Sequence, residues 1–327
     1  MGILGWIGSA ISSVSSFVGS CISGAAKVCG GIVKGAVAGL SKIGGAIGGL
    51  ASKAAGFLGG LTGGLTAFLA PVFGPLAPII SDIIVNVLTN VLMNLLIDKG
   101  EPEMEEEEIE EYGFLMEESA NHPEWPKEES FSSAKEHYLK LKELAEGENI
   151  HMTEAKRFSA ESLRRRTMGM AALWERLERR EGITIAREFL VHAGLKMFDK
   201  DQFRSVLDAS KELGYTTVPY MDFKEGKMNP EEEEKYIEAV VNKIREVKAE
   251  NGETLDIVSA YKQFNDMKAN PDDNFALERY KPLWDKFEAV NPNTLYDVNE
   301  LKAEYKEYNL QDELDKLDKL GEVEKHS

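Results

Sequence analysis

The first 98 residues of the chain combine very little charge with glycines that recur every four positions. They hold two acidic and four basic residues, whereas the whole chain of 327 residues has a net charge of −18. A glycine inside a helix in water costs about 0.5–1 kcal/mol relative to alanine. A segment this rich in glycine should therefore not form a stable helix by itself, and it needs either lipid or a closely packed partner.

The glycines form three ladders at a four-residue spacing. The ladders are Gly31, Gly35 and Gly39; Gly45 and Gly49; and Gly56, Gly60 and Gly64. In lipid the backbone must satisfy its own hydrogen bonds, which imposes a helix, and small residues at this spacing let two helices approach closely. We therefore predict helices that associate in a membrane. The alternatives are a tightly packed helical hairpin in water and a flexible linker.

Four lysines follow one side of this segment. When each residue advances about 100° around a helix, they fall within an arc of roughly 100°; the set is Lys27, Lys34, Lys42 and Lys53. Such a cationic stripe could face anionic lipid headgroups or a water-filled lumen. The alternative is an ordinary solvated face.

A second apolar helix is predicted after a turn marked by Pro71, Pro75 and Pro78. Ser81 or Asp82 is expected to cap its start, and Gly100 followed by Pro102 to end it. A polar side chain recurs every four residues along it, at Asp82, Asn86, Asn90, Asn94 and Asp98. Amides can hydrogen-bond between helices in lipid, so the asparagines predict helix association or a pore lining, with the aspartates near the helix ends. The alternative is a helix of a soluble bundle with its asparagines outward.

The rest of the chain is acidic and divides into two parts. Residues 99–129 contain 13 acidic residues and two lysines, and self-repulsion predicts an extended connector. Residues 130–327 predict a soluble domain of about seven helices, with caps at Ser133, at Asn229 before Pro230, and at Thr294. Its expected core members are Trp174, Phe189, Leu190, Phe203, Leu207, Phe264, Trp284 and Phe287. The predicted fold is all-α, with a hydrophobic region at 1–98, a connector at 99–129 and a soluble domain at 130–327.

One basic island interrupts the acidic domain. Between Lys156 and Arg187 there are nine basic and four acidic residues, and the basic ones include Arg164, Arg165 and Arg166. The island could bind anionic lipid, the carboxylates of a partner, or the acidic connector. We hypothesise that it latches residues 101–118 and restrains the hydrophobic region, the alternative being a solvated face with local ion pairs.

No catalytic, cofactor or metal site is predicted from the sequence. The glycine-rich part lacks the strand context of a nucleotide-binding fingerprint, and the chain has no nucleophile elbow, P-loop or zinc-protease motif. The five histidines show no second ligand at metal-binding spacing. The acidic balance also argues against a nucleic-acid partner, because such proteins need positive charge.

The stretch from Gly31 to Gly64 resembles the glycine-zipper segments of membrane-inserting bacterial toxins and secretion-system effectors. The proline turn and the apolar helix after it look like the hydrophobic hairpin of helical pore formers. The resemblance implies a protein that leaves water, inserts helices in a target membrane, and oligomerises or permeabilises it. We therefore predict a membrane-inserting, pore-forming or membrane-permeabilising protein that is secreted or delivered to its target membrane and is soluble before insertion. Its expected partners are lipid, further copies of itself and a delivery or chaperone protein. Two other interpretations stay open: a particle-associated structural or ejection component of a virion or other large assembly, and an enzyme anchored by its N-terminal arm.

Overall fold

The computed structural model describes residues 32–43, 49–73, 77–153, 155, 159–270 and 306, apart from the side chains of residues 66–79. The prediction of an all-α fold is confirmed, since the described residues form helices and no strand. Within them one isolated parallel bridge joins Thr184 and Thr217. Gly31, Gly45 and Lys27, together with Thr294, Trp284 and Phe287, lie outside the described residues.

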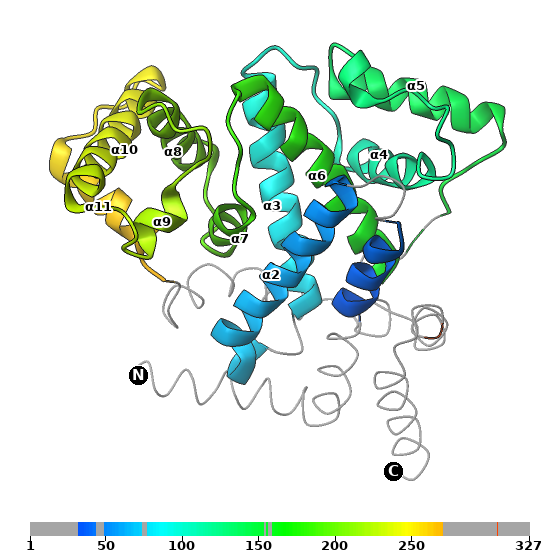
Figure 1. Ribbon diagram of the computed structural model, residues 1–327, viewed down its shortest axis with the longest axis horizontal. Helices are drawn as coiled ribbons and strands as arrows, with labels where there is room; N and C mark the ends of the chain where they lie inside the picture. Colours follow the sequence, from blue (N-terminus) through cyan, green and yellow to red (C-terminus); the bar gives the residue numbers. More distant parts are fainter. Residues whose placement is uncertain are drawn as a thin grey trace, which may run out of the picture.

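The helices follow one another with short connections (Figure 1). After a helical stretch at 32–43 they are α2 (Gly49–Phe73), α3 (Ala77–Ile97), α4 (Glu106–Glu118), the short 3-10 helix η2 (Glu128–Ser130), α5 (Ala134–Gly147), α6 (Ala160–Glu181), α7 (Arg187–Leu195), α8 (Lys200–Glu212), α9 (Tyr220–Lys224), α10 (Pro230–Glu250) and α11 (Ile257–Lys268). Helices α2, α3 and α6 occupy the centre of Figure 1, with α4 and α5 on one side and α8 to α11 on the other. The short helix α7 lies between the centre and α8 to α11.

Local sequence signals explain several helix ends. Asn229 caps α10 through a hydrogen bond from the backbone N–H of Glu232, and Pro230 occupies the first turn, as predicted. The Ser133 side chain caps α5, although the Glu136 carboxylate reaches back to the N–H of Ser132 instead of completing a capping box. Helix α3 ends before Gly100, whose φ of +83° is readily adopted by glycine.

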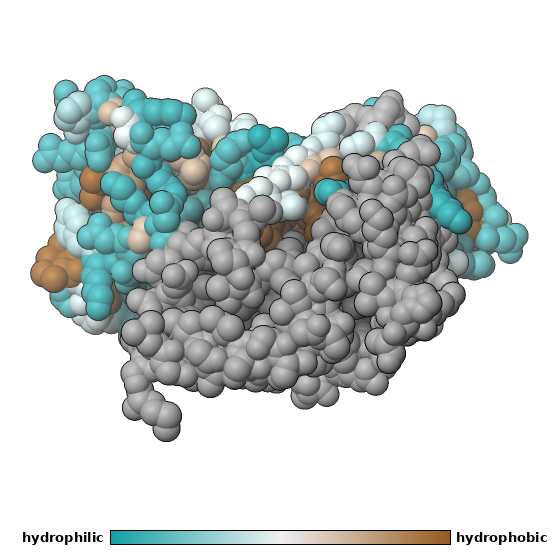
Figure 2. Space-filling view, turned by 90° about the horizontal axis from the view of Figure 1, so that it is seen from below, coloured by the Kyte–Doolittle hydropathy of each residue, from teal (hydrophilic) through white to brown (hydrophobic). Residues whose placement is uncertain are grey.

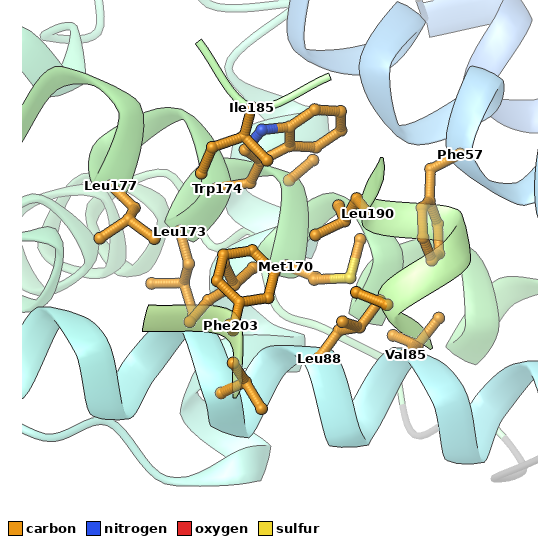
Figure 3. Packing of buried hydrophobic residues seen from close by; sticks show 14 of the residues in the cluster. Phe57, Val85, Leu88, Met170, Leu173, Trp174, Leu177, Ile185, Leu190 and Phe203 are labelled. Atoms are coloured by element: carbon orange, nitrogen blue, oxygen red, sulfur yellow. The ribbon is translucent and has the colours of Figure 1, made fainter. Parts of the chain in front are cut away.

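The core is shared by helices from all parts of the described chain. Figure 3 shows Phe57 of α2 and Leu88 of α3 in one apolar cluster with Met170 and Trp174 of α6 and Leu190 of α7. The predicted core members Trp174, Phe189, Leu190, Phe203, Leu207 and Phe264 are all buried. Packing therefore crosses the predicted divisions at residues 98 and 129, because the apolar faces of α2 and α3 are covered by α6 and α7.

Two expectations about local structure are wrong. Residues 106–118 form the helix α4 packed on α6, so residues 99–129 are not an extended connector. The arginines of α6, more than 45 residues away in sequence, offset the self-repulsion of the glutamates. Helix α3 begins at Ala77 and not at Ser81 or Asp82, which are both buried inside its second turn.

The described surface is mostly hydrophilic in the view of Figure 2. Large hydrophobic side chains that remain exposed in the described part of the chain are few, and they are Leu139, Leu213, Ile257, Val258 and Tyr261. Three of these five lie together in the first turns of α11, and none belongs to α2 or α3. The long apolar helices α2 and α3 are therefore accommodated by packing within the chain.

Candidate functional site: apolar helices held by arginines and a short helix

The ladder of Gly56, Gly60 and Gly64 brings α2 close to α7. A Cβ built at Gly60 would lie 3.1 Å from Val191 Cγ2, and one at Gly64 would lie 2.7 Å from Leu195 Cδ1. At Gly56 the same atom would lie 3.0 Å from Arg187 Nη1. The residues of α7 that fill the ladder are themselves four apart, so the two helices mesh over two turns. This ladder is thus occupied within the chain.

The other predicted glycines and lysines do not form one surface. Gly35 and Gly39 are buried in the helical stretch 32–43, whereas Gly49 is exposed at the start of α2. Lys34 and Lys42 are exposed on the same stretch. Lys53 instead contacts α6: its Nζ lies 2.5 Å from Glu178 Oε2 and 5.1 Å from the centroid of the Trp174 ring. The described lysines therefore do not line one free cationic stripe.

Helix α3 is the one described helix that is long and apolar enough to cross a membrane, by length and composition alone. The qualifying window is Ile80–Ile97, and 67% of it is buried inside the molecule. A core helix of a soluble protein satisfies the same criterion. The described part of the chain thus contains one possible membrane-spanning helix in a buried position.

The asparagine series of α3 divides into two environments. Asn90 and Asn94 are exposed, and the Asn94 side-chain amide donates to the carbonyl of Asn90 at 2.8 Å. Asn86 instead donates to Glu106 Oε1 of α4 at 3.0 Å. Asp82 was expected near a helix end, where a charge can reach solvent. It lies instead in the second turn of α3 and is only 2% exposed. The asparagines point outward or toward α4, and no second α3 helix is needed to account for them in this fold.

Arg166 connects three helices at the buried end of that series. From α6 its Nε donates to Glu110 Oε2 at 2.8 Å, and its Nη1 donates to Asn86 Oδ1 at 3.1 Å and pairs with Glu106. The same Nη1 lies 3.7 Å from Asp82 Oδ1. Nearby carboxylates raise the pKa of Arg166 in spite of its burial, so the guanidinium stays charged. One arginine thus neutralises acidic groups of both α3 and α4.

Arg164 binds the far end of α4. Its Nε donates to Glu117 Oε1 at 2.9 Å, and the Glu117 side chain is only 6% exposed. Burial raises the pKa of Glu117, and the positive charge of Arg164 offsets part of that increase. Arg165 does not join this contact, since it pairs with Glu161 and donates to the carbonyl of Thr153 at 2.9 Å. Two of the three predicted arginines therefore pair with carboxylates of residues 101–118, and the third lies over the Phe114 ring, 5.1 Å from its centroid.

A second arginine group on α6 was not singled out from the sequence. Arg176 Nε donates to Glu101 Oε1 at 2.6 Å, and its Nη1 donates to Glu128 Oε1 at 2.9 Å. Arg180 Nε donates to the same Glu101 oxygen at 3.0 Å. The Glu101 side chain is fully buried, so its charge depends on these partners. The four-residue spacing of Arg176 and Arg180 was the available signal for this group.

Helices α4 and α6 touch through their backbones. A Cβ at Gly113 would overlap the carbonyl oxygen of Arg165, and a Cβ at Gly169 would overlap that of Ile109. Each position accepts only glycine at this separation, because the obstructing atom belongs to a backbone. The acidic helix is therefore fixed on α6 by shape as well as by charge.

Two buried histidines join helices in their neutral form. His137 Nε2 donates to the carbonyl of Pro126 at 3.0 Å, so its Nδ1 accepts from the Tyr112 hydroxyl at 2.8 Å. His192 Nε2 donates to the carbonyl of Met267 at 2.9 Å. Burial lowers the pKa of His137, and it lowers the pKa of His192 to about 4. Protonation of His192 would place a charge between α7 and the end of α11.

The fold brings together His122, Glu124 and Glu148, whose spacing along the chain does not predict a metal site. His122 Nδ1 lies 3.2 Å from Glu124 Oε1 and 3.3 Å from Glu148 Oε2. Trp125 stacks on the His122 ring and donates its Nε1–H to Glu148. These three side chains could hold a divalent cation. The exposed fractions of the glutamate side chains, 65% and 44%, make the group open to solvent.

Comparison of the chain with protein-family models, with curated proteins and with solved structures gives no match. The function has therefore to be inferred from the contacts of the chain itself.

Proposed function

We propose that the protein inserts into and permeabilises a lipid membrane, and that the described fold is its water-soluble storage form. The proposal assigns insertion to α2 and α3 and assigns restraint of these helices to α4, α6 and α7. The homo-oligomer predicted from the sequence would form after insertion.

The observation that carries the proposal is the presence in α2 of two exposed glycines, Gly59 and Gly63, that are not packed against any described residue. Nothing in the described part of the chain lies within 4 Å of a Cβ built at Gly59 or Gly63. Each glycine costs about 1 kcal/mol relative to alanine in a helix interior. The close packing of Gly60 and Gly64 on α7 offsets this cost, whereas Gly59 and Gly63 make no such contact with a described residue. A second state, in which another helix approaches this face of α2, would account for them.

The apolar window of α3 supports the same proposal. The window is long enough to span a bilayer. The acidic residues of this segment lie near its two ends, where each is paired with a basic side chain. Asp82 at its start is paired with an arginine, while Asp98 beyond its end pairs with Lys200 at 3.0 Å on the surface. The ion pairs to α6 would have to break before α3 could leave.

The test uses the full chain and vesicles of anionic lipid that contain a self-quenched dye. We expect release of dye and co-flotation of the protein with the vesicles. Absence of both would refute the proposal, and a stable complex with other particle proteins without leakage would favour an assembly component instead.

A charge placed at Asn90 tests whether α3 is the inserted segment. Asn90 is exposed in the fold but lies near the middle of the Ile80–Ile97 window. Asn90→Lys should leave unfolding unchanged, yet a lysine at a bilayer centre costs about 2.5–3.5 kcal/mol, or roughly a hundredfold in leakage. Asn121→Lys, the same change at an exposed position outside the apolar helices, is the control. Equal leakage from the two variants would contradict insertion of α3.

A further inference from the structure

Helix α7 lies against both helices to which insertion is assigned. It fills the α2 ladder with Val191 and Leu195, as described above. Helix α3 packs closely on Gly194 of α7, since a Cβ at Gly194 would lie 2.6 Å from Ile84 Cγ2 and 2.9 Å from Leu88 Cδ1. Large side chains of α7 thus enter small positions of α2, and large side chains of α3 enter a small position of α7. Helix α7 therefore occupies part of the ladder, although Gly60 stays exposed beside it.

Helix α7 packs most extensively on α2 and α3, and it is also joined to α8, α9 and α11 by specific side-chain contacts. The Phe189 ring lies 5.1 Å from that of Phe203 on α8 and 5.2 Å from that of Tyr220 on α9. His192 is bound to the carbonyl of Met267 at the end of α11. The N-cap residue of α7, Ala186, supplies no side-chain hydrogen bond, and the helix is nine residues long. A helix this short depends on its packing for stability.

We propose that α7 is an intramolecular stopper, and that its departure from α2, carried by movement of α8 to α11, is the step that permits insertion. This inference rests on the proposed function, and it adds the contact that controls it. While α7 stays in place, Val191 and Leu195 obstruct the approach of another helix to Gly60 and Gly64, and α3 remains covered at Ile84 and Leu88.

A reversible cross-link between α2 and α7 tests the stopper. In the double variant Gly60→Cys, Val191→Cys the sulfur at 191 could take the place of Val191 Cγ2, which lies 3.1 Å from a Cβ at Gly60. The two Cβ atoms would then be roughly 4–4.6 Å apart, at the upper end of the range for a disulfide. Cys21→Ser and Cys29→Ser form the background, so that only the introduced thiols can pair. The pair Asn121→Cys, Val191→Cys is the matched control, because Asn121 is exposed after α4, outside the helices to which insertion is assigned.

We expect the oxidised Gly60–Val191 pair to release dye at least tenfold more slowly than the same protein after reduction. The control pair should release dye at the same rate with and without reductant. If Gly60→Cys, Val191→Cys does not fold, Gly64→Cys, Leu195→Cys provides the equivalent link. Equal rates for the oxidised and reduced linked protein would overturn the stopper and leave the proposed function standing. No leakage from either form or from the background protein would overturn the proposed function, and the stopper with it.

Discussion

Two pairs of glycines in α2, Gly59 with Gly63 and Gly60 with Gly64, predict different effects of the same substitution on stability. Nothing described lies within 4 Å of a Cβ at Gly59 or Gly63, so alanine at both positions gains only helix propensity. At about 1 kcal/mol for each glycine, the double variant should raise the free energy of unfolding by about 2 kcal/mol. In a thermal melt this corresponds to an increase of roughly 4–8 °C in Tm.

The second pair should not gain this stability. Alanine at Gly60 and Gly64 brings the same propensity, but the added carbons meet Val191 Cγ2 at 3.1 Å and Leu195 Cδ1 at 2.7 Å. Overpacking of this kind costs about 1–3 kcal/mol, so the second double variant should be no more stable than the parent. Urea unfolding followed by circular dichroism measures the difference between the two variants, which we expect to be at least about 2 kcal/mol.

Dye release supplies the second half of this test. If Gly59 and Gly63 serve close helix approach in a membrane, their alanine variant should be more stable and yet slower in leakage. Equal changes in stability for the two pairs would refute the assignment of α7 to Gly60 and Gly64. A stabilised Gly59→Ala, Gly63→Ala variant with unchanged leakage would refute the functional explanation of these two glycines.

Two further predictions concern charge. Removing Arg166 leaves buried carboxylates of α3 and α4 without their cation, so Arg166→Ala should lower the free energy of unfolding by about 3–5 kcal/mol. The control Lys235→Ala breaks an exposed pair and should change this free energy by less than about 1 kcal/mol. Similar values for the two variants in urea unfolding would contradict the role given to Arg166. Because the pKa of folded His192 is about 4 and an unfolded histidine titrates near 6.5, the unfolded state binds the proton first as the pH falls, and stability is lost from about pH 6.5 down to about pH 4. His192→Gln, which keeps a donor for Met267, should lose up to about 3 kcal/mol less than the parent between pH 7 and pH 4, and identical pH profiles would refute this.

Local signals in the sequence anticipated much of the helical domain. Helix α10 follows from Asn229 and Pro230, whose effects are confined to one turn, and buried aromatic residues such as Phe189 follow from their size and apolar character. These features depend on neighbours in sequence or on burial alone, and both can be deduced from composition and spacing.

The errors arose where distant residues meet. The glutamates of residues 99–129 predict repulsion when they are considered alone, but α4 forms because Arg164 and Arg166 lie opposite Glu117 and Glu110. The position of Lys53 around a helix predicted that it would lie on a cationic stripe. In the fold it pairs instead with Glu178, 125 residues away. Long-range pairing of this kind produces no periodic pattern in the sequence. The hypothesis that the basic island contacts residues 101–118 depended only on their opposite charges.

The backbone contact at Gly113 and Gly169 also bears on how the acidic helix responds to ionic strength. Salt at physiological concentration screens exposed charges over about 8 Å, so it should weaken the partly exposed pair between Arg166 and Glu106. Screening does not remove the steric match, because a shift of α4 by one residue would press a side chain against the carbonyl of Arg165. The helix can therefore occupy one register on α6 or leave it entirely. Ionic strength changes how firmly α4 is bound without changing where it is bound.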